Sequence, residues 1–208
     1  MTHRKCGSVC VRLLHFLCVL FAGYAMMSYI CTRKQESMIT RERLKGAYSE
    51  GEALAIYKEV KAEGDFVGFC RMFMWDEDYL VARNALWGLT KAAKQEMATL
   101  QPLLDSLVDL TMSTDNSSVR RLSLNIIERL DMKEDDLRTD FLDFCLEHAV
   151  DMGEFPGIQS LCLKIAYRMC SFYPELMGEL KRMVEDMDPM CYSPAVKSVR
   201  KRIMCGRM

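Results

Sequence analysis

The sequence predicts an all-α protein in which helical hairpins repeat along the chain to form a short α-solenoid. Half of its 208 residues are hydrophobic, which is enough to build a substantial core. The chain holds 17 Met and only 5 Pro, and no segment alternates Val, Ile and Thr over the length of a strand. An apolar pattern recurs every 38 or 39 residues, and a fixed period of this length is typical of helical repeats.

Residues 1–37 are predicted to be an apolar segment separate from the repeats. The run Phe16–Ile30 is uncharged, with three basic residues before it and five in Arg33–Lys45. Three interpretations stay open. The run is a signal-anchor helix with the repeats on the cytoplasmic side, a signal peptide cleaved after the small residues of Gly23–Ala25, or an upstream stretch before a true start at Met26, Met27 or Met38.

Residues 38–63 are predicted to form two helical stretches that cap the first repeat. Their apolar residues are Leu44, Tyr48, Leu54, Ile56, Tyr57 and Val60. The repeats themselves are predicted over residues 64–208. The last helix, which ends at Arg200–Arg202, is so charged on its outer side that we expect it to serve as the C-terminal cap.

Each repeat is marked by a β-branched leader residue near the start of its second helix. The leaders are 38, 39 and 38 positions apart, and they are Val81, Val119, Ile158 and Val196. In the first three repeats a small residue follows four positions later and a leucine five positions later. This pattern places the side chains on one face of a helix, so we expect the four leaders to be buried at equivalent places.

A first helix is predicted before each leader helix, so that each repeat is a helical hairpin. The first (A) helices span roughly 64–74, 98–112, 134–151 and 174–188. The leader-bearing (B) helices span 79–95, 118–130, 157–172 and 194–207. Short polar turns separate the two helices of each pair. Ser193 with Pro194, and likewise Pro174, supply residues that commonly open a helix.

The second hairpin resembles the HEAT and armadillo-like repeat superfamily, which often has an Asp in the turn and a Val-Arg pair after it. The matching residues are Asp115, Val119 and Arg120, whereas the other leaders are followed by Ala82, Gln159 and Lys197. The resemblance covers residues 64–208. It implies a right-handed α-solenoid of about four HEAT-like hairpins whose B helices line the concave face, and a protein that holds a partner.

Charge is sorted between the two kinds of helix. The A helices from residue 98 onward hold 14 acidic and 3 basic residues, whereas the B helices hold 13 basic residues and 1 acidic residue. With the B helices on the concave side, the resemblance implies a basic inner face and an acidic outer face. An alternative stays open, in which A and B helices pair their charges with each other and leave little net field.

Residues two, six and ten positions after each leader lie on the side of the B helix away from its buried stripe. We predict that these residues contact the partner, namely Arg83, Trp87, Lys91, Arg121, Asn125, Arg129, Lys164, Arg168 and Arg202. The predicted partner is an acidic protein or peptide, and a nucleic-acid backbone is the alternative. From residue 38 onward 23 basic residues face 28 acidic ones, which excludes a generally basic nucleic-acid-binding surface.

No catalytic motif occurs in the sequence: it has no phosphate-binding glycine loop, no H-E-x-x-H helix and no G-x-S-x-G turn. We expect His148 on the solvated side of an acidic helix and Cys145 in a buried apolar row. The prediction is a non-enzyme without cofactor, metal or small-molecule substrate. One enzymatic alternative is a DNA-alkylation-repair glycosylase of similar fold, although no Asp lies at the predicted inner positions.

The cysteines after residue 38 have no metal-binding spacing and are expected to be buried. They are Cys70, Cys145, Cys162, Cys170, Cys191 and Cys205, and none belongs to a C-x-x-C pair. Unpaired thiols fit a reducing compartment. We therefore expect a cytoplasmic protein, tethered to a membrane only if residues 1–37 are an anchor.

Overall fold

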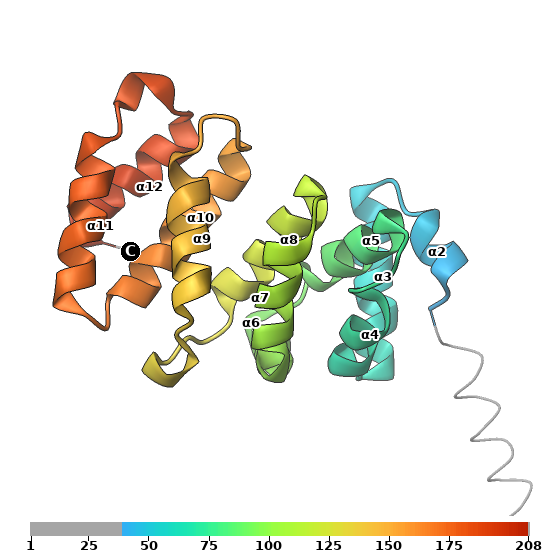
Figure 1. Cartoon of the computed structure of the whole chain (residues 1–208). Helices are drawn as coiled ribbons and strands as arrows, with labels where there is room; N and C mark the ends of the chain where they lie inside the picture. Colours follow the sequence, from blue (N-terminus) through green and yellow to red (C-terminus); the bar gives the residue numbers. More distant parts are fainter. Residues whose placement is uncertain (1–38, 208) are drawn as a thin grey trace, which may run out of the picture. The chain divides into compact units, whose positions relative to one another are not determined.

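A computed structural model describes residues 39–207 of the protein, so the three interpretations of segment 1–37 lie outside the described residues. The chain from Arg41 onward forms one compact unit. Every regular element of the described chain is a helix, which confirms the prediction of an all-α protein (Figure 1). No helix in this part of the chain is long and apolar enough to cross a lipid bilayer.

Four consecutive helical hairpins make up most of the unit (Figure 1). They pair α4 (Phe66–Phe73) with α5 (Tyr79–Leu89), α7 (Leu104–Ser113) with α8 (Ser117–Arg129), α9 (Thr139–Val150) with α10 (Pro156–Cys170), and α11 (Pro174–Asp186) with α12 (Pro194–Met204). The second helices form a B layer in which α5 packs on α8, α8 on α10 and α10 on α12. The predicted repeat of helical hairpins is confirmed.

The four leader residues are buried, as the sequence predicts. Their exposed fractions are 0%, 2%, 0% and 0% for Val81, Val119, Ile158 and Val196. The small residue and the leucine that follow each of the first three leaders are also buried: Ala85, Leu86, Ser123, Leu124, Cys162 and Leu163. The i, i+4, i+5 stripe therefore forms the packed face of each B helix.

Two helices precede the hairpins and pack against α5: α2 (Arg41–Lys45) and α3 (Glu50–Glu63). The N-cap Ser49 and Glu52 form a capping box at the start of α3, and Gly64 ends the helix with a left-handed φ of 77°. Helix α3 lies very close to α5, because a Cβ placed on Gly88 would stand 2.7 Å from Cγ2 of Ile56.

Two A helices differ from the prediction of uninterrupted helices over 98–112 and 134–151. After a short α6 (Lys94–Met97), the chain forms a 3-10 helix, η1 (Ala98–Leu103), which contains Pro102. In an α-helix the ring of Pro102 would clash with the carbonyl four residues earlier. In the third repeat, η2 (Glu134–Asp136) is separated from α9 by the extended backbone of Leu137 and Arg138. The first B helix is also shorter than predicted, since α5 ends at Leu89.

Burial of the cysteines is confirmed for four of the six. Cys70, Cys145, Cys162 and Cys170 are buried, and burial raises the pKa of Cys70 to about 12 and that of Cys170 to about 11. The expectation is wrong for Cys191 and Cys205, which are exposed. Cys191 lies in the turn η3 (Pro189–Cys191), and Cys205 is the C-cap residue of α12.

Candidate functional site

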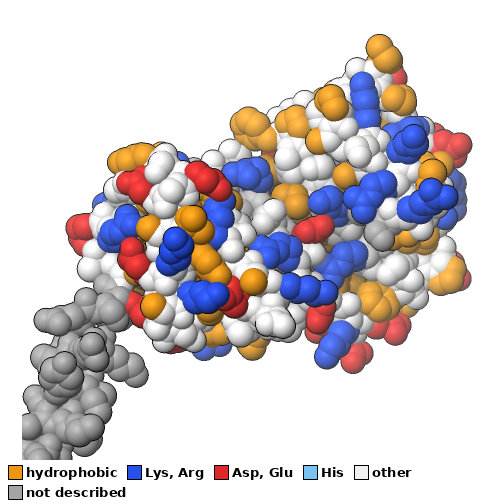
Figure 2. All heavy atoms as spheres, turned by 180° about the vertical axis from the view of Figure 1, so that it is seen from behind, with side chains coloured by type: hydrophobic (Ala, Val, Ile, Leu, Met, Phe, Trp, Pro, Cys, Tyr) orange, Lys and Arg blue, Asp and Glu red, His pale blue; other side chains and the backbone are white. Residues whose placement is uncertain are grey.

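The charge sorting holds with the observed helix ends. Helices α5, α8, α10 and α12 carry ten Lys and Arg residues and one acidic residue, Glu128. Helices α7, α9 and α11 carry nine acidic residues and two basic ones. Figure 2, which shows the side facing away from α9 and α11 in Figure 1, has Lys and Arg side chains spread across it with few carboxylates between them.

Two of the predicted partner-binding residues hold successive B helices together. Arg129, at the end of α8, donates hydrogen bonds to the backbone carbonyls of Thr90 and Ala92, at 2.8 and 2.5 Å. Arg168, near the end of α10, donates to the carbonyls of Glu128 and Leu130, at 2.5 and 2.6 Å. The same contact therefore occurs at the same place in two consecutive repeats.

These arginines donate to carbonyl groups at the end of the preceding B helix and in the turn just after it. The last four carbonyls of an α-helix have no N–H within the helix to accept from, and a cation near them also meets the negative end of the helix dipole. Asn84 makes a related contact at the first repeat, since its buried amide donates to the carbonyl of Leu44 in α2 at 2.7 Å. A polar side chain of the B helix thus ties each of the first three repeats to the preceding part of the chain, whereas Arg200 of α12 donates to the carbonyls of Val184 and Glu185 at the end of α11 in its own hairpin.

Three further predicted residues also make contacts between neighbouring elements. Lys164 of α10 pairs with Glu128 of α8 at 3.3 Å, and Lys91 pairs with Glu50 of α3. Arg83 donates to the carbonyl of Ala47 at 3.4 Å. In these contacts the basic side chains of the B layer reach toward the preceding unit of the chain rather than toward the acidic A helices.

The remaining predicted residues differ in exposure. Arg121 and Arg202 are exposed, whereas Trp87 and Asn125 are half-buried, with the Lys91 ammonium 5.9 Å from the centre of the Trp87 ring. Arg202 donates to the carbonyl of Arg207 at 3.1 Å. Within residues 39–207 no hydrogen bond or ion pair holds the guanidinium of Arg121. Whether any of the nine residues contacts a partner stays a prediction.

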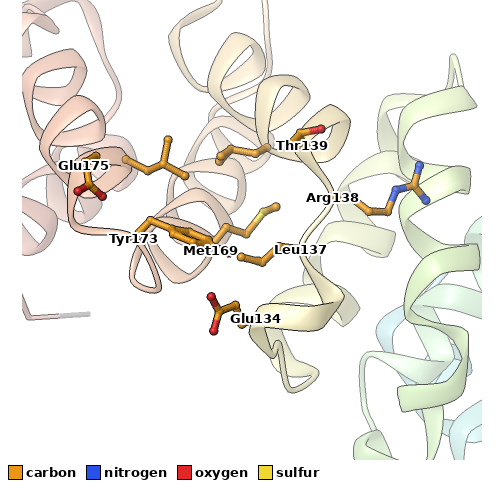
Figure 3. Close-up of a pocket in the computed structure, with 9 residues that line it drawn as sticks. Glu134, Leu137, Arg138, Thr139, Met169, Tyr173 and Glu175 are labelled. Carbon is orange, nitrogen blue, oxygen red and sulfur yellow. The ribbon is translucent and has the colours of Figure 1, made fainter.

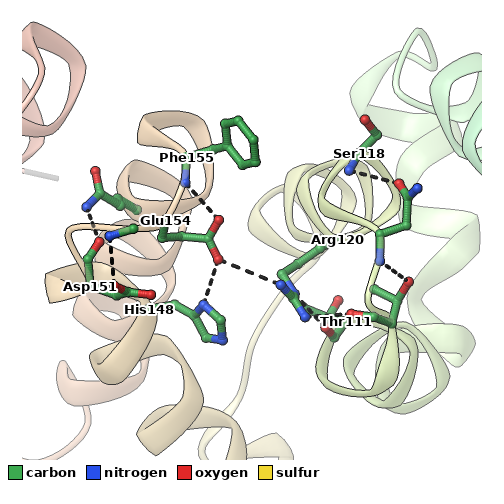
Figure 4. A network of polar contacts seen from close by, with 11 residues as sticks. Thr111, Ser118, Arg120, His148, Asp151, Glu154 and Phe155 are labelled. Carbon is green, nitrogen blue, oxygen red and sulfur yellow. Dashed lines mark hydrogen bonds and ion pairs between the residues drawn. The ribbon is translucent and has the colours of Figure 1, made fainter.

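A polar network links the second and third repeats (Figure 4). Glu154, with 6% of its side chain exposed, accepts from His148 at 2.7 Å and lies 3.7 Å from Arg120. Arg120 also donates to the carbonyls of Thr111 and Thr114, at 3.3 and 2.5 Å. The expectation of a solvated His148 is wrong, because the ring packs on Phe144 with 4.1 Å between ring centres.

No arrangement typical of catalysis is seen in the described part of the chain. Cys145, the thiol nearest to His148 in sequence, is fully buried, and burial raises its pKa well above the usual range. Among residues 39–207 no group of three or more His, Cys, Asp and Glu side chains is placed to hold a metal ion.

One comparison with known proteins gives a match. A family model described as a HEAT repeat domain matches residues 40–207. The match begins beside α2 and therefore includes α2 and α3, which were predicted as caps outside the repeats. No curated protein and no solved structure matches the chain.

Proposed function

The chain belongs to the HEAT repeat domain family, and we propose that it is a non-catalytic scaffold whose B-helix side binds an acidic segment of a partner protein. Helical repeats of this kind stack into extended surfaces that bind other proteins. The sorted charge of the B helices carries the proposal, because ten basic residues share that layer with a single carboxylate. An acidic segment is attracted to such a layer over several ångströms.

Exposure and pairing divide the nine predicted residues into three groups. Arg121 and Arg202 are the exposed cations, and in this proposal they contact carboxylates of the partner. Arg83, Trp87, Lys91, Asn125 and Lys164 are half-buried, and they border the surface. Arg129 and Arg168 are occupied by backbone carbonyls, so we assign to them the support of the neighbouring helices rather than contact with the partner.

An acidic protein segment fits these residues better than a nucleic-acid backbone does. Proteins that bind nucleic acid tightly contact about six to ten phosphates with unpaired cations. On this surface several cations already pair with neighbouring carboxylates or carbonyls, among them Lys91 and Lys164. The few unpaired cations can each pair with one carboxylate of an acidic segment, because the side chains of that segment reach them separately.

The test compares two pairs of charge reversals. Arg121→Glu with Arg202→Glu changes the B layer, and Arg71→Glu with Arg182→Glu changes exposed arginines of the A helices α4 and α11 by the same charge. Fluorescence anisotropy then measures binding of a labelled Glu-Ala repeat peptide and of a single-stranded oligonucleotide of equal charge. We expect the first pair to weaken peptide binding about tenfold and the second pair to leave it within about twofold.

The controls separate failure of the fold from failure of the proposal. Circular dichroism and the midpoint of urea unfolding must stay unchanged, because all four arginines are exposed. Equal peptide binding by both variants would contradict the proposed surface. Preferential binding of the oligonucleotide, with a steep dependence on salt concentration, would favour the nucleic-acid alternative instead.

A further inference from the structure

An apolar cleft opens where the third and fourth repeats meet, away from the charged residues of the B layer. It lies between the start of α9, the end of α10 and the start of α11, and its volume is about 370 Å³ (Figure 3). Its apolar walls are formed by Leu137, Leu142, Met169 and Leu176. Ligand sites in proteins typically measure about 300 to 1,000 Å³ and are lined mainly by apolar side chains.

The cleft exists because α11 buries only one half of its apolar stripe. Leu176, Leu180 and Val184 are spaced i, i+4, i+8 and so lie on one face of α11. Leu180 and Val184 are buried, with 2% and 0% exposed, whereas Leu176 is only half-buried. No residue of Pro174–Glu179 is buried. The first turns of α11 therefore present apolar surface that the described chain does not cover.

Carboxylates stand on two sides of this apolar surface. Glu134 comes from η2 and Glu175 from the first turn of α11, and Figure 3 shows them at different edges of the cleft. The Tyr173 hydroxyl hydrogen-bonds to Glu134, which raises the pKa of Tyr173. Asp135 and Asp136 follow Glu134 directly, and Lys133 precedes it. This turn therefore carries three carboxylates and a single cation.

Arg138, the one arginine that lines the cleft, does not neutralise Glu134 or Glu175. Arg138 lines the opening, but its guanidinium is bound to Asp109 at 2.6 Å and to Asp140 at 2.7 Å. Both hydrogen bonds raise the pKa of Arg138. Figure 3 shows this side chain directed away from Glu134 and Glu175. A ligand that fits the cleft therefore has an apolar part that fills it and positive charges that lie beside Glu134 and Glu175.

We propose that the cleft binds a basic amphipathic helix of a partner protein. Two apolar side chains of that helix, one turn apart, fill the space between Met169 and Leu176, and flanking Lys or Arg residues pair with Glu134 and Glu175. The cleft admits a helix because it is open to solvent along the edge of the repeats, as in other complexes where an amphipathic helix lies in an apolar groove. This site is independent of the B-helix surface, which attracts the opposite charge.

The experiment uses two designed peptides and the full chain. The first peptide has leucines at i, i+3 and i+7 with flanking lysines, and the second has uncharged glutamines in place of the lysines. We expect the lysine peptide to bind about three- to tenfold more tightly, because Glu134 and Glu175 attract lysine side chains but not glutamine side chains. Binding should also shift the methyl NMR signal of Met169, assigned with Met169→Leu.

Two variants and one control locate the site. Glu134→Gln with Glu175→Gln should weaken the lysine peptide about three- to tenfold, and Leu176→Gln should weaken it by removing apolar contact. The control Glu147→Gln with Glu185→Gln removes two exposed carboxylates elsewhere on α9 and α11, and we expect binding within about twofold of the unmodified chain. All variants are first checked by circular dichroism.

Four results would overturn the proposal. They are equal affinity for the two peptides, no binding of the lysine peptide, an equal loss in the control, or an unshifted Met169 signal. Dimerisation that the Glu134 and Glu175 substitutions abolish would identify a second copy of this chain as the occupant, and the proposal of a separate partner would fall. None of these results depends on the B-helix surface.

Discussion

At the residue scale, Arg129 and Arg168 are predicted from the sequence to contact a partner, but in the structure they bond to the preceding repeat. Both lie ten positions after a leader, where the helical period correctly places them off the buried stripe. The period does not give the direction of a long side chain, and both guanidiniums turn back to the carbonyls at the end of the preceding B helix. The sequence therefore predicts the position of these residues but not their contacts.

We expect Arg129→Met and Arg168→Met each to lower the free energy of unfolding by about 1.5–3 kcal/mol. Each substitution removes two hydrogen bonds from a charged guanidinium to backbone carbonyls of the preceding repeat. Arg121→Met is the matched control, since Arg121 lies on α8 without such a bond, and it should change stability by less than about 0.5 kcal/mol. Urea unfolding followed by circular dichroism measures all three. Equal effects of Arg129→Met and Arg121→Met would contradict the proposed role.

At the element scale, three of the four B helices follow the sequence prediction closely, whereas two of the four A helices are interrupted and α5 ends early, at Leu89. The B helices carry the periodic leaders, and burial of these leaders against neighbouring helices favours regular helix. Two A helices are interrupted by local chemistry, one at Pro102, whose ring clashes with the carbonyl four residues earlier in an α-helix, and one at Arg138, an extended residue whose guanidinium binds two carboxylates. The proline was visible in the sequence, whereas the Arg138 contacts depend on Asp109 from another repeat.

The packing of α3 on α5 gives a second prediction at this scale. Gly88→Ala adds a Cβ 2.7 Å from Cγ2 of Ile56, and such overpacking costs about 1–3 kcal/mol. Alanine favours a helix over glycine by about 1 kcal/mol, so we expect a net loss of stability of up to about 2 kcal/mol. In an Ile56→Ala background the same substitution should become neutral or stabilising. A thermal unfolding series over the four variants measures this coupling, and an equal loss in both backgrounds would refute the close contact.

At the scale of the whole molecule, the chain has two surfaces of opposite character. The B layer gathers cations, and the cleft beside α11 combines apolar walls with Glu134 and Glu175. The sequence predicted the first surface, because charge sorting is visible once the repeats are aligned. It did not reveal the cleft, because half-burial of Leu176 depends on how α11 packs beside α9 and α10. The hairpin repeat and the leaders followed from the period alone.

The most direct test of the account is where an acidic segment binds. A zero-length carbodiimide cross-link joins a peptide carboxylate only to a lysine that it touches, and mass spectrometry identifies that lysine. With the Glu-Ala repeat peptide, we predict cross-links on Lys91 and Lys164, which lie ten and six positions after their leaders and whose carboxylate partners a peptide carboxylate can replace. Lys133 and Lys181, outside the B layer, serve as controls. Cross-links concentrated on Lys133 and Lys181, or spread evenly over all these lysines, would contradict binding by the B-helix side.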